Sequence, residues 1–511
     1  MSHQPRLSLE TLAEHPPTDT RVVGPAVDAA ALSIGIVHFG IGAFHRAHQA
    51  VYTELAAEAT GDTGWGILGV TGRSDSVVQQ LAPQDCLYGV LQKGADDTEL
   101  RLIASVRGAA WPGRDSELVV ATLAAPTTHI ATLTITEKGY LRGADGSIDL
   151  SAPAVQNDLD LVGSELAGGA DERMSQTPIG LLVRGLARRF RQGGEPFTVV
   201  PCDNLVGNGE VTRALVTSLV RAVGGADAAA RDRRDGLLGW LEASVSFPST
   251  MVDRIAPATT DADRDEALAL LGLRDEALVV AEPFRQWVIE DDFAGPRPAW
   301  EQAGAIITAD VAPYEAVKLR TLNATHSLLA YLGALKGHRT IAEAVSDPAL
   351  RDVARAVIDD DILPTLVAPE GIDLGEYRDS VLERFANPNL AHTTRQVAMD
   401  GSQKLPGRIL GTALDRLEAG HTPNGQALAV AAWISYIAAT LEPGGPTLDD
   451  PLAAVLQAAV GSADAVTGDP EALVDRVLAL DAVFPAALRN SAVFRAAVVA
   501  QLPVVRSLTA R

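Results

Sequence analysis

The chain has 511 residues, of which 47% are hydrophobic, and it carries 42 Lys and Arg against 65 Asp and Glu, a formal net charge of −23. This length suggests two to four domains, each with enough apolar content to bury a core. The excess of negative charge disfavours binding to phosphate backbones or anionic lipid surfaces. We therefore expect a small-molecule partner, with no nucleic acid and no membrane.

The cysteine content and the apolar stretches indicate the compartment. Cys86 and Cys202 lie far apart without neighbouring thiols, so neither a disulfide framework nor a thiolate zinc cluster is expected. Residues 1–17 lack the apolar core and cleavage site of a secretory signal. The longest apolar stretch, 427–440, is shorter than the roughly 20 residues that cross a bilayer, and we expect a buried helix there. These features predict a cytoplasmic protein.

Strand and helix patterns alternate in the N-terminal part of the chain, which predicts a parallel sheet with helical crossovers. The expected strands cover residues 34–40, 65–70, 128–136 and 197–201, and the expected helices cover 45–59 and 180–193. Helical patterns dominate beyond about residue 299, over 314–335, 346–367 and 423–441. We expect an α/β domain over residues 1–298 and a mostly helical domain over 299–511. The Gly- and Asp-rich stretch 163–176 is expected to be a surface loop without a function.

The first expected strand leads into the segment GIGAFHRAHQA, where Gly40 and Gly42 precede a helical pattern. Glycines at this bend let the backbone approach a pyrophosphate, and a helix N-terminus offers free N–H groups. His45 occupies the third position of the G-x-G-x-x-G pattern, so the pattern alone also fits an ordinary tight turn. Phe44 and Arg46 complete the expected cofactor contacts, with Arg46 either reaching a phosphate oxygen or lying on a helix surface.

The segment after the second expected strand bears on the choice of cofactor. In this kind of fold an acidic residue there accepts a hydrogen bond from the ribose 2′-hydroxyl of NAD, and a basic one accommodates the 2′-phosphate of NADP. Asp75 fits the first role, while Arg73 and Ser74 fit the second. We expect NAD, with NADP possible.

Three polar residues follow one another on the first helix of the expected helical domain. At 100° per residue, Lys318, Asn323 and His326 lie on one side of that helix. A desolvated lysine can take the hydroxyl proton of a secondary alcohol, and an amide donor can stabilise the resulting oxyanion. The alternative is a solvated face that carries Lys318 and Arg320, with His326 as a core histidine.

Two further segments place polar residues near the same chemistry. The cluster CDNLVGN follows the strand at 197–201, so Asp203, Asn204 and Asn208 are expected where open α/β sheets bind ligands. Asp253 and Arg254 are adjacent in an apolar surrounding, where they either serve the site or form a structural ion pair.

Taken together, these segments resemble the mannitol dehydrogenase family, the long-chain polyol dehydrogenases that also include fructuronate reductase. VSFPSTMVDRIAP fits the family signature, and five further segments are similar to family blocks in the expected order, namely IVHFGIGAFHRAHQA, TITEKGY, CDNLVGNG, KLRTLNATHS and MDGSQKLPGR. The resemblance extends from about residue 34 to beyond 410. It implies a Rossmann-type N-terminal domain, a largely helical C-terminal domain, and zinc-independent NAD(P) chemistry in a cleft between them.

The resemblance also implies residue roles. Lys318 matches the general base of the family, and Asn323 and Asn204 match the two amides that hold the reacting oxygen. His326 and Asp253 match positions of the substrate site.

The segment AMDGSQKLP separates two branches of the family. Lys404 matches a substrate-binding lysine, but Gln396 and Met399 stand where mannitol-oxidising members have an arginine and a histidine. These two departures disfavour mannitol as the substrate. The fructuronate reductase branch is slightly favoured, because Lys404 or Arg408 would bind a carboxylate.

We thus expect reversible hydride transfer at C2, with D-mannonate and D-fructuronate slightly ahead of D-mannitol and D-fructose. A dehydrogenase for mannitol 1-phosphate or another pentitol or hexitol is an alternative within enzymes. The non-enzymatic alternative is a protein that only senses NAD(H). No coiled-coil pattern is present, and we expect a monomer.

Overall fold

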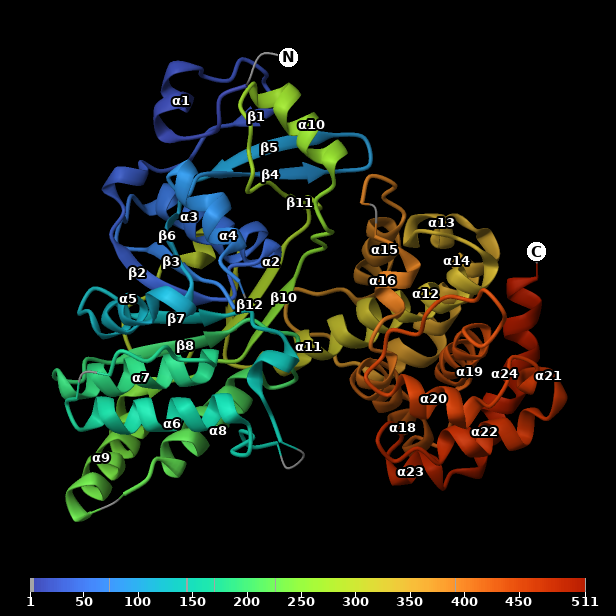
Figure 1. Ribbon diagram of the computed structural model, residues 1–511. Coiled ribbons are helices and arrows are strands. Elements are labelled where there is room, and N and C mark those ends of the chain that lie inside the picture. The colour runs from blue at the N-terminus through green and yellow to red at the C-terminus, as the bar shows by residue number, and fades with distance from the viewer. Residues whose placement is uncertain are drawn as a thin grey trace. The chain divides into compact units, whose positions relative to one another are not determined.

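The computed structural model describes residues 4–510 apart from 73, 144, 145, 170, 226 and 391, and of residues 137 and 138 only the backbone (Figure 1). The chain divides into two compact units, Met1–Val311 and Ala312–Arg511. Residues 299–311, which follow the boundary expected from composition, contribute a 3-10 turn and a strand to the first unit. Trp300 explains this placement, because its side chain is fully buried in a core of that unit.

The N-terminal unit combines thirteen strands with ten α-helices among its described residues. The strands are β1 (Val22–Val23), β2 (Ile34–Phe39), β3 (Gly66–Val70), β4 (Tyr88–Lys93), β5 (Thr98–Ile103), β6 (Val106–Ala110), β7 (Ile130–Leu133), β8 (Phe197–Pro201), β9 (Val245–Ser246), β10 (Thr250–Asp253), β11 (Val279–Ala281), β12 (Gln286–Glu290) and β13 (Ile306–Thr308). The helices are α1 (Leu9–Glu14), α2 (Ala43–Ala47), α3 (Gln49–Thr60), α4 (Ser76–Leu81), α5 (Pro112–Ala124), α6 (Pro153–Leu166), α7 (Pro178–Arg191), α8 (Asn208–Ala222), α9 (Ala228–Ser244) and α10 (Asp261–Leu271).

The main sheet of this unit has six strands in the order β6-β3-β2-β7-β8-β9, and every neighbouring pair is parallel. From β2 the chain moves outward through β3 to β6, and from β7 it moves outward in the other direction through β8 to β9. The order therefore reverses between β2 and β7, the point where open α/β sheets bind their ligands. This confirms the expected Rossmann-type domain.

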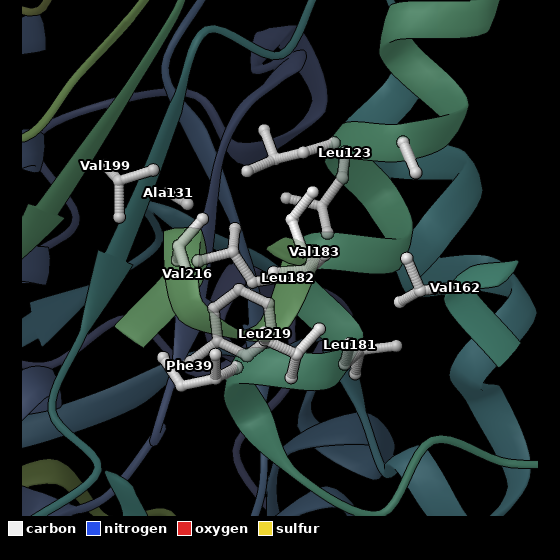
Figure 2. Packing of buried hydrophobic residues seen from close by; sticks show 14 of the residues in the cluster. Phe39, Leu123, Ala131, Val162, Leu181, Leu182, Val183, Val199, Val216 and Leu219 are labelled. Atoms are coloured by element: carbon white, nitrogen blue, oxygen red, sulfur yellow. The ribbon is translucent and has the colours of Figure 1, made fainter. Parts of the chain in front are cut away.

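Helices cover both faces of the main sheet, so successive side chains of a strand enter two different cores. Phe39 and Val199 point into a core formed with α5, α6, α7 and α8, where Leu123, Leu182 and Leu219 meet them (Figure 2). The alternate residues of the same strands enter the other core, with α2 and α3 and the aromatic rings of β12 and η4 (Trp300–Ala303). Burial on both faces explains the nearly continuous apolar runs of these strands.

Two smaller sheets complete the N-terminal unit. One has the order β1-β5-β4-β11 and contains the antiparallel hairpin of β4 and β5, and the other has the order β10-β12-β13. No strand is expected from the sequence between residues 88 and 103, where this hairpin lies. Both of its faces are buried, since Leu91, Leu100 and Leu102 pack with α10 and the N-terminal segment, whereas Tyr88 and Val90 enter the core that contains α2 and α3.

The C-terminal unit consists of helices and turns in its described part, as expected. The first helices are α11 (Ala312–Val317), α12 (Ala324–Lys336), α13 (Ile341–Ser346), α14 (Pro348–Val357), α15 (Leu374–Phe385), α16 (Thr394–Ala398), α17 (Gly401–Leu405) and α18 (Gly411–Glu418). The last are α19 (Asn424–Ala439), α20 (Ala453–Val460), α21 (Ala465–Gly468), α22 (Pro470–Leu478), α23 (Ala486–Arg489) and α24 (Ala492–Thr509). Three π-helical segments interrupt them, η5 (Lys318–Asn323), η6 (Ile358–Ile362) and η8 (Pro406–Leu410).

Helix α19 is the central helix of the C-terminal unit and contains most of the apolar stretch 427–440. Its residues are buried nearly all round, and α12 and α24 pack against it. The expected buried helix is thus confirmed. In the described part of the chain, α24 is the one helix whose length and mean hydropathy would also suit a membrane span.

Arg189 of α7 joins several segments of the N-terminal unit, and its replacement tests how much its hydrogen bonds contribute to the free energy of unfolding. Its buried guanidinium donates hydrogen bonds of 2.8 to 3.3 Å to five carbonyl oxygens, those of Leu123, Ala125, Thr128, Glu195 and Pro196. Burial lowers the pKa of this group. We expect Arg189→Met to lower the free energy of unfolding by about 3 kcal/mol, because the carbonyl groups lose their donors.

Chemical denaturation followed by tryptophan fluorescence measures this change. Arg221→Met is the matched control, because Arg221 is exposed on α8 and has no hydrogen bond or ion pair to the described residues. Equal stability of the two variants would contradict the prediction.

Candidate active site

The turn after β2 requires glycine at position 40. Gly40 has φ +97°, and a Cβ atom there would lie 2.1 Å from the carbonyl oxygen of Thr134. Its N–H donates to Val70 O at 2.8 Å, and its own carbonyl accepts the N–H of Gly42 at 2.6 Å. The turn therefore packs directly against the ends of β3 and β7, an approach that no residue with a side chain permits.

A crevice of about 400 Å³ opens beside this turn. Its lining comes from the carboxyl ends of β2, β3, β6 and β7 and from the starts of α5 and α7, and comprises Phe39, Gly40, Val70, Thr71, Gly72, Trp111, Pro112, Gly113, Ile135, Met174, Ser175, Gln176, Thr177, Pro178 and Leu181. Two of the lining hydroxyl groups, those of Thr71 and Ser175, are buried without a hydrogen-bond partner in the described part of the chain. Buried polar groups without partners are rare in proteins, so these two mark a surface that suits a ligand with polar groups.

The other residues expected at the cofactor are placed as follows. Gly42 is exposed and caps α2, while Phe44 is half-buried against the core and stacks on His48 with ring centres 5.1 Å apart. Asp75 precedes α4, and its carboxylate accepts a 2.8 Å hydrogen bond from Gln79. Arg73 lies outside the described residues.

The expectation that Arg46 reaches a phosphate oxygen is wrong for this structure. Its side chain is only 6% exposed, and its guanidinium donates to the carbonyl oxygens of Ala277 and Gly42 and lies over the ring of Tyr88. Burial lowers its pKa. Arg46 therefore ties α2 to the segment before β11, a contact that lies 231 residues away in the sequence.

The cluster after β8 contains two structural residues and one exposed residue. The carboxylate of Asp203 accepts hydrogen bonds from the N–H groups of Ile135 and Thr136 and from the hydroxyl of Tyr140, at 2.7 to 3.2 Å. The amide of Asn208 bonds three backbone groups, of Asp203 and Thr250.

The expected ligand contacts of Asp203 and Asn208 are thus replaced by structural ones, and only Asn204 is exposed. Asp203 also holds a strained backbone, because Thr136 has φ +65° and ψ 161°, a region that residues other than glycine rarely adopt.

Asp253 and Arg254 have separate surroundings at the end of β10. Arg254 is buried and donates to the carbonyl oxygens of Glu282 and Ala47 and to the side chain of Gln92. Burial lowers its pKa to about 10. Asp253, the last residue of β10, is buried as well. The contacts of Arg254 are therefore with backbone and amide oxygens, and not those of an ion pair with its neighbour.

The helix that carries Lys318, Asn323 and His326 does not have the uniform 100° step assumed for it. Lys318–Asn323 is a π-helical segment, in which the N–H of Ala324 donates to the carbonyl of Leu319, five residues back. This wider turn brings residues five apart, such as Lys318 and Asn323, onto the same side of the helix. Both side chains are 6% exposed, whereas Arg320 lies on the other side and pairs with Asp415.

Two polar atoms near Lys318 are buried without a partner among the described residues. They are Nδ2 of Asn323 and Nε2 of His326. The imidazole of His326 stacks on Phe385 at 4.7 Å and meets His392 edge-on at 4.8 Å. Burial lowers its pKa well below the ordinary value, and the charges of Arg408 and Lys404 add to this effect. His326 is therefore a neutral ring at pH 7 that offers one hydrogen-bonding nitrogen.

The residues expected to separate the two branches lie on α16, α17 and η8 and, for Met399, directly after α16. Lys404 is half-buried, and its Nζ donates to the carbonyl of Val397 at 3.1 Å. Arg408 donates to Asn323 O at 3.4 Å and to Ser327 Oγ at 3.1 Å, so it supports the π-helical turn. Met399 is half-buried and Gln396 is exposed.

Sequence reasoning missed most of the crevice lining. Met174, Ser175 and Gln176 belong to the stretch 163–176, to which no function was assigned, yet they form one wall of the crevice. Asp158 of α6 holds this wall, since its carboxylate accepts the N–H groups of Gln176 and Thr177 at 2.8 Å. Trp111 had a usable signal, because Trp-Pro-Gly directly follows β6 and proline is favoured in the first turn of a helix such as α5. Within the described part of the chain, no three His, Cys, Asp or Glu side chains form a set that could hold a metal ion.

Comparison with known proteins places both units in one family. The model of the mannitol dehydrogenase Rossmann domain matches residues 34–302, and that of the mannitol dehydrogenase C-terminal domain matches residues 310–505. D-mannonate oxidoreductase of Escherichia coli is 42% identical over 442 residues, which cover 85% of this chain and 87% of the relative. Mannitol 2-dehydrogenase of Aspergillus fumigatus is 34% identical over 467 residues, which cover 90% and 88%.

A solved structure agrees with the sequence relatives. Mannitol 2-dehydrogenase of Pseudomonas fluorescens, in a ternary complex with NAD and D-mannitol, superposes with a TM-score of 0.82 and 35% identity over 99% of this chain and 98% of that chain. Identity at this level over nearly the whole length, together with both domain matches, shows that this chain is an oxidoreductase that belongs to the mannitol dehydrogenase family.

Proposed function

We propose that this protein is an NAD-dependent dehydrogenase that transfers a hydride at C2 between a keto-uronate or ketose and the matching aldonate or polyol. D-fructuronate and D-mannonate are the slightly favoured pair, with D-fructose and D-mannitol close behind. We further infer a zinc-independent reaction and a cytoplasmic monomer. The two buried free thiols, Cys86 and Cys202, suit a reducing compartment.

The observation that carries this proposal is the pair of unpartnered atoms beside Lys318, Nδ2 of Asn323 and Nε2 of His326. Oxidation of a secondary alcohol leaves a hydroxyl proton to be removed and negative charge on the oxygen. Lys318 serves as the base for this proton, and the Asn323 amide donates to the oxygen as the charge develops. Asn204 supplies the second amide, and His326 and Asp253 bind hydroxyl groups of the substrate.

The crevice beside Gly40 fits NAD. Gly40 lines it with backbone atoms alone, and the hydroxyl groups of Thr71 and Ser175, which have no partner among the described residues, suit ribose or diphosphate oxygens. When bound, the nicotinamide supplies the hydride acceptor. Asp75 is the acidic residue after β3 and supports NAD over NADP, since a carboxylate there repels a 2′-phosphate.

The charge around His326 supports an acidic substrate. Burial lowers the pKa of His326 most, followed by His392, and the positive charges of Arg408, Lys404 and Arg384 add to this effect, so three cations act on this ring. Guanidinium and ammonium groups bind carboxylates through charge-assisted hydrogen bonds. The 42% identity to a D-mannonate oxidoreductase supports the same substrate class.

Removal of the proposed base gives the first test. We expect Lys318→Ala to lower kcat by about 10²- to 10⁴-fold with fructuronate and NADH, because the loss falls on proton transfer in the transition state. The decrease in NADH absorbance measures it, with fructuronate, fructose and other ketoses, and with NADH and NADPH in parallel. Lys336→Ala is the control, since Lys336 lies at the end of α12 in an ion pair with Asp347.

Near-wild-type turnover in Lys318→Ala would disprove the role of the base. Binding of NADH to the wild-type protein without turnover of any ketose or keto-uronate would favour a sensing protein instead. Activity confined to fructose 6-phosphate would favour the dehydrogenase for mannitol 1-phosphate.

The substrate class rests on Lys404. We expect Lys404→Met to lower kcat/KM for fructuronate by about 10- to 100-fold, because a charge-assisted hydrogen bond to the carboxylate is lost. For fructose the change stays below about fivefold, since no charge is paired. Gln403→Met introduces the same side chain one position earlier, at an exposed residue, and serves as control. A loss of equal size with both substrates would contradict recognition of a carboxylate by Lys404.

A further inference from the structure

We propose that His38 is a positioning residue for the cofactor, which shapes the turn at Gly40 through a directional chain of hydrogen bonds. This inference rests on the proposed binding of NAD in the crevice. His38 is the last residue but one of β2 and is fully buried, and it is not among the cofactor residues expected from the sequence.

Both ring nitrogens of His38 have close partners. Nδ1 lies 2.7 Å from Thr132 Oγ1, and Nε2 lies 2.8 Å from Thr134 Oγ1 and 3.1 Å from the carbonyl oxygen of Gly40. Thr132 belongs to β7, the strand next to β2, and Thr134 directly follows β7. The ring therefore joins the two strands at which the order of the sheet reverses.

The partners determine the protonation state of the ring. A carbonyl oxygen only accepts hydrogen bonds, so Nε2 carries the proton that points to Gly40 and Thr134. Burial lowers the pKa of His38 to about 3, which leaves Nδ1 without a proton at neutral pH. Nδ1 therefore accepts the hydroxyl proton of Thr132.

The chain of donors ends on the Gly40 carbonyl. Thr134 Oγ1 accepts from His38 and donates its own proton to that oxygen at 2.8 Å. The same oxygen accepts the N–H of Gly42. Three donors thus hold one peptide group at the turn, and each of them fixes the direction in which the carbonyl points.

His45 packs on one face of the His38 ring. It belongs to α2, directly after the turn, and its imidazole stacks on His38 with the centroids 3.3 Å apart and the planes at 13°. The pKa of His45 is also lowered well below its ordinary value by burial and by His38. Two neutral rings stack without charge repulsion, so the start of α2 keeps a defined distance from β2.

This arrangement acts on the crevice because Phe39 and Gly40, which directly follow His38, line it. A dinucleotide diphosphate approaches the backbone of such a turn, so the orientation of the Gly40 peptide determines which backbone groups face it. Loss of these hydrogen bonds would leave the overall fold intact but let the Gly40 peptide group rotate. The expected consequence is weaker binding of the cofactor, with little change in the chemical step.

Thr134 offers the sharpest test, because valine has the same shape without the hydroxyl group. We expect Thr134→Val to raise the Kd and KM for NADH by about tenfold, since one hydrogen bond to the turn and one to His38 are lost. The kcat at saturating NADH and the KM for the sugar substrate stay within about twofold. Thr134→Ser restores the hydroxyl group and brings the KM for NADH back to within about threefold of wild type.

His38 itself is tested by the pair His38→Leu and His38→Gln. Leucine removes the donor, whereas the glutamine amide can donate again to Gly40 and Thr134. We expect His38→Leu to raise the KM for NADH by at least about tenfold and His38→Gln to recover part of this loss. Should His38→Leu fail to fold, the Thr134 pair decides the question.

Val199→Ala separates positioning from general stability. Val199 is buried in the core of the same sheet, away from the turn, so its truncation lowers the melting temperature without touching the chain of hydrogen bonds. Its KM for NADH stays at the wild-type value. NADH fluorescence titration and thermal melting are measured on all variants.

The possible outcomes are distinct. An unchanged KM for NADH in Thr134→Val, with a melting temperature lowered as in Val199→Ala, would overturn the positioning role and leave the proposed function standing. A wild-type protein that binds no NADH in the titration would overturn the proposed function, and this inference with it.

Discussion

The close approach of the Gly40 backbone to β7 is the constraint on which the N-terminal unit depends. Because a Cβ atom at this position would lie 2.1 Å from Thr134 O, the chain can turn from β2 into α2 here only with glycine. The turn then donates hydrogen bonds to the last residue of β3 and accepts one from the residue after β7. Two cores, one on each face of the sheet, hold these strand ends in register, and the crevice forms where the strands end.

Buried polar groups divide into two classes in this molecule. Asp203, Asn208, Arg189 and Arg254 make most of their hydrogen bonds with backbone groups, so they hold loops of the N-terminal unit in place. Other buried groups, those of Thr71, Ser175, Asn323 and His326, keep an atom without a partner among the described residues. Since leaving such a group unpaired is costly, the second class points to places where a ligand completes the bonding.

Much of the fold and part of the site were predictable from the sequence. Strands buried on both faces have no polar alternation, and this pattern located β2, β3, β7 and β8. The glycine turn was recognisable because it follows such a strand directly. Near Lys318 the spacing was informative, but the assumed 100° step was wrong, since nothing in the residues 318–323 signals the extra residue of a π-helical turn.

The remaining features depend on contacts between distant parts of the chain. Arg46 was expected to bind phosphate because it follows the glycine turn. Its actual partner, the carbonyl of Ala277, is 231 residues away in the sequence and could not be foreseen. The wall at 174–176 looked like an ordinary loop because its anchor is a single carboxylate on α6, Asp158. Local patterns cannot reveal such contacts, since in each of them a charged side chain bonds backbone groups that have no sequence signature of their own.

Positive charges act locally on His326 in the C-terminal unit in spite of the net charge of −23. Exposed charges farther apart than a Debye length of about 8 Å are largely screened at physiological ionic strength. The cations at positions 384, 404 and 408 act on the His326 ring, which is already neutral through burial. A neutral imidazole within a cationic surrounding can bind a hydroxyl group without competing for the base. In the proposed function, proton transfer is therefore assigned to Lys318, and recognition of an acidic substrate is assigned to the positive charges.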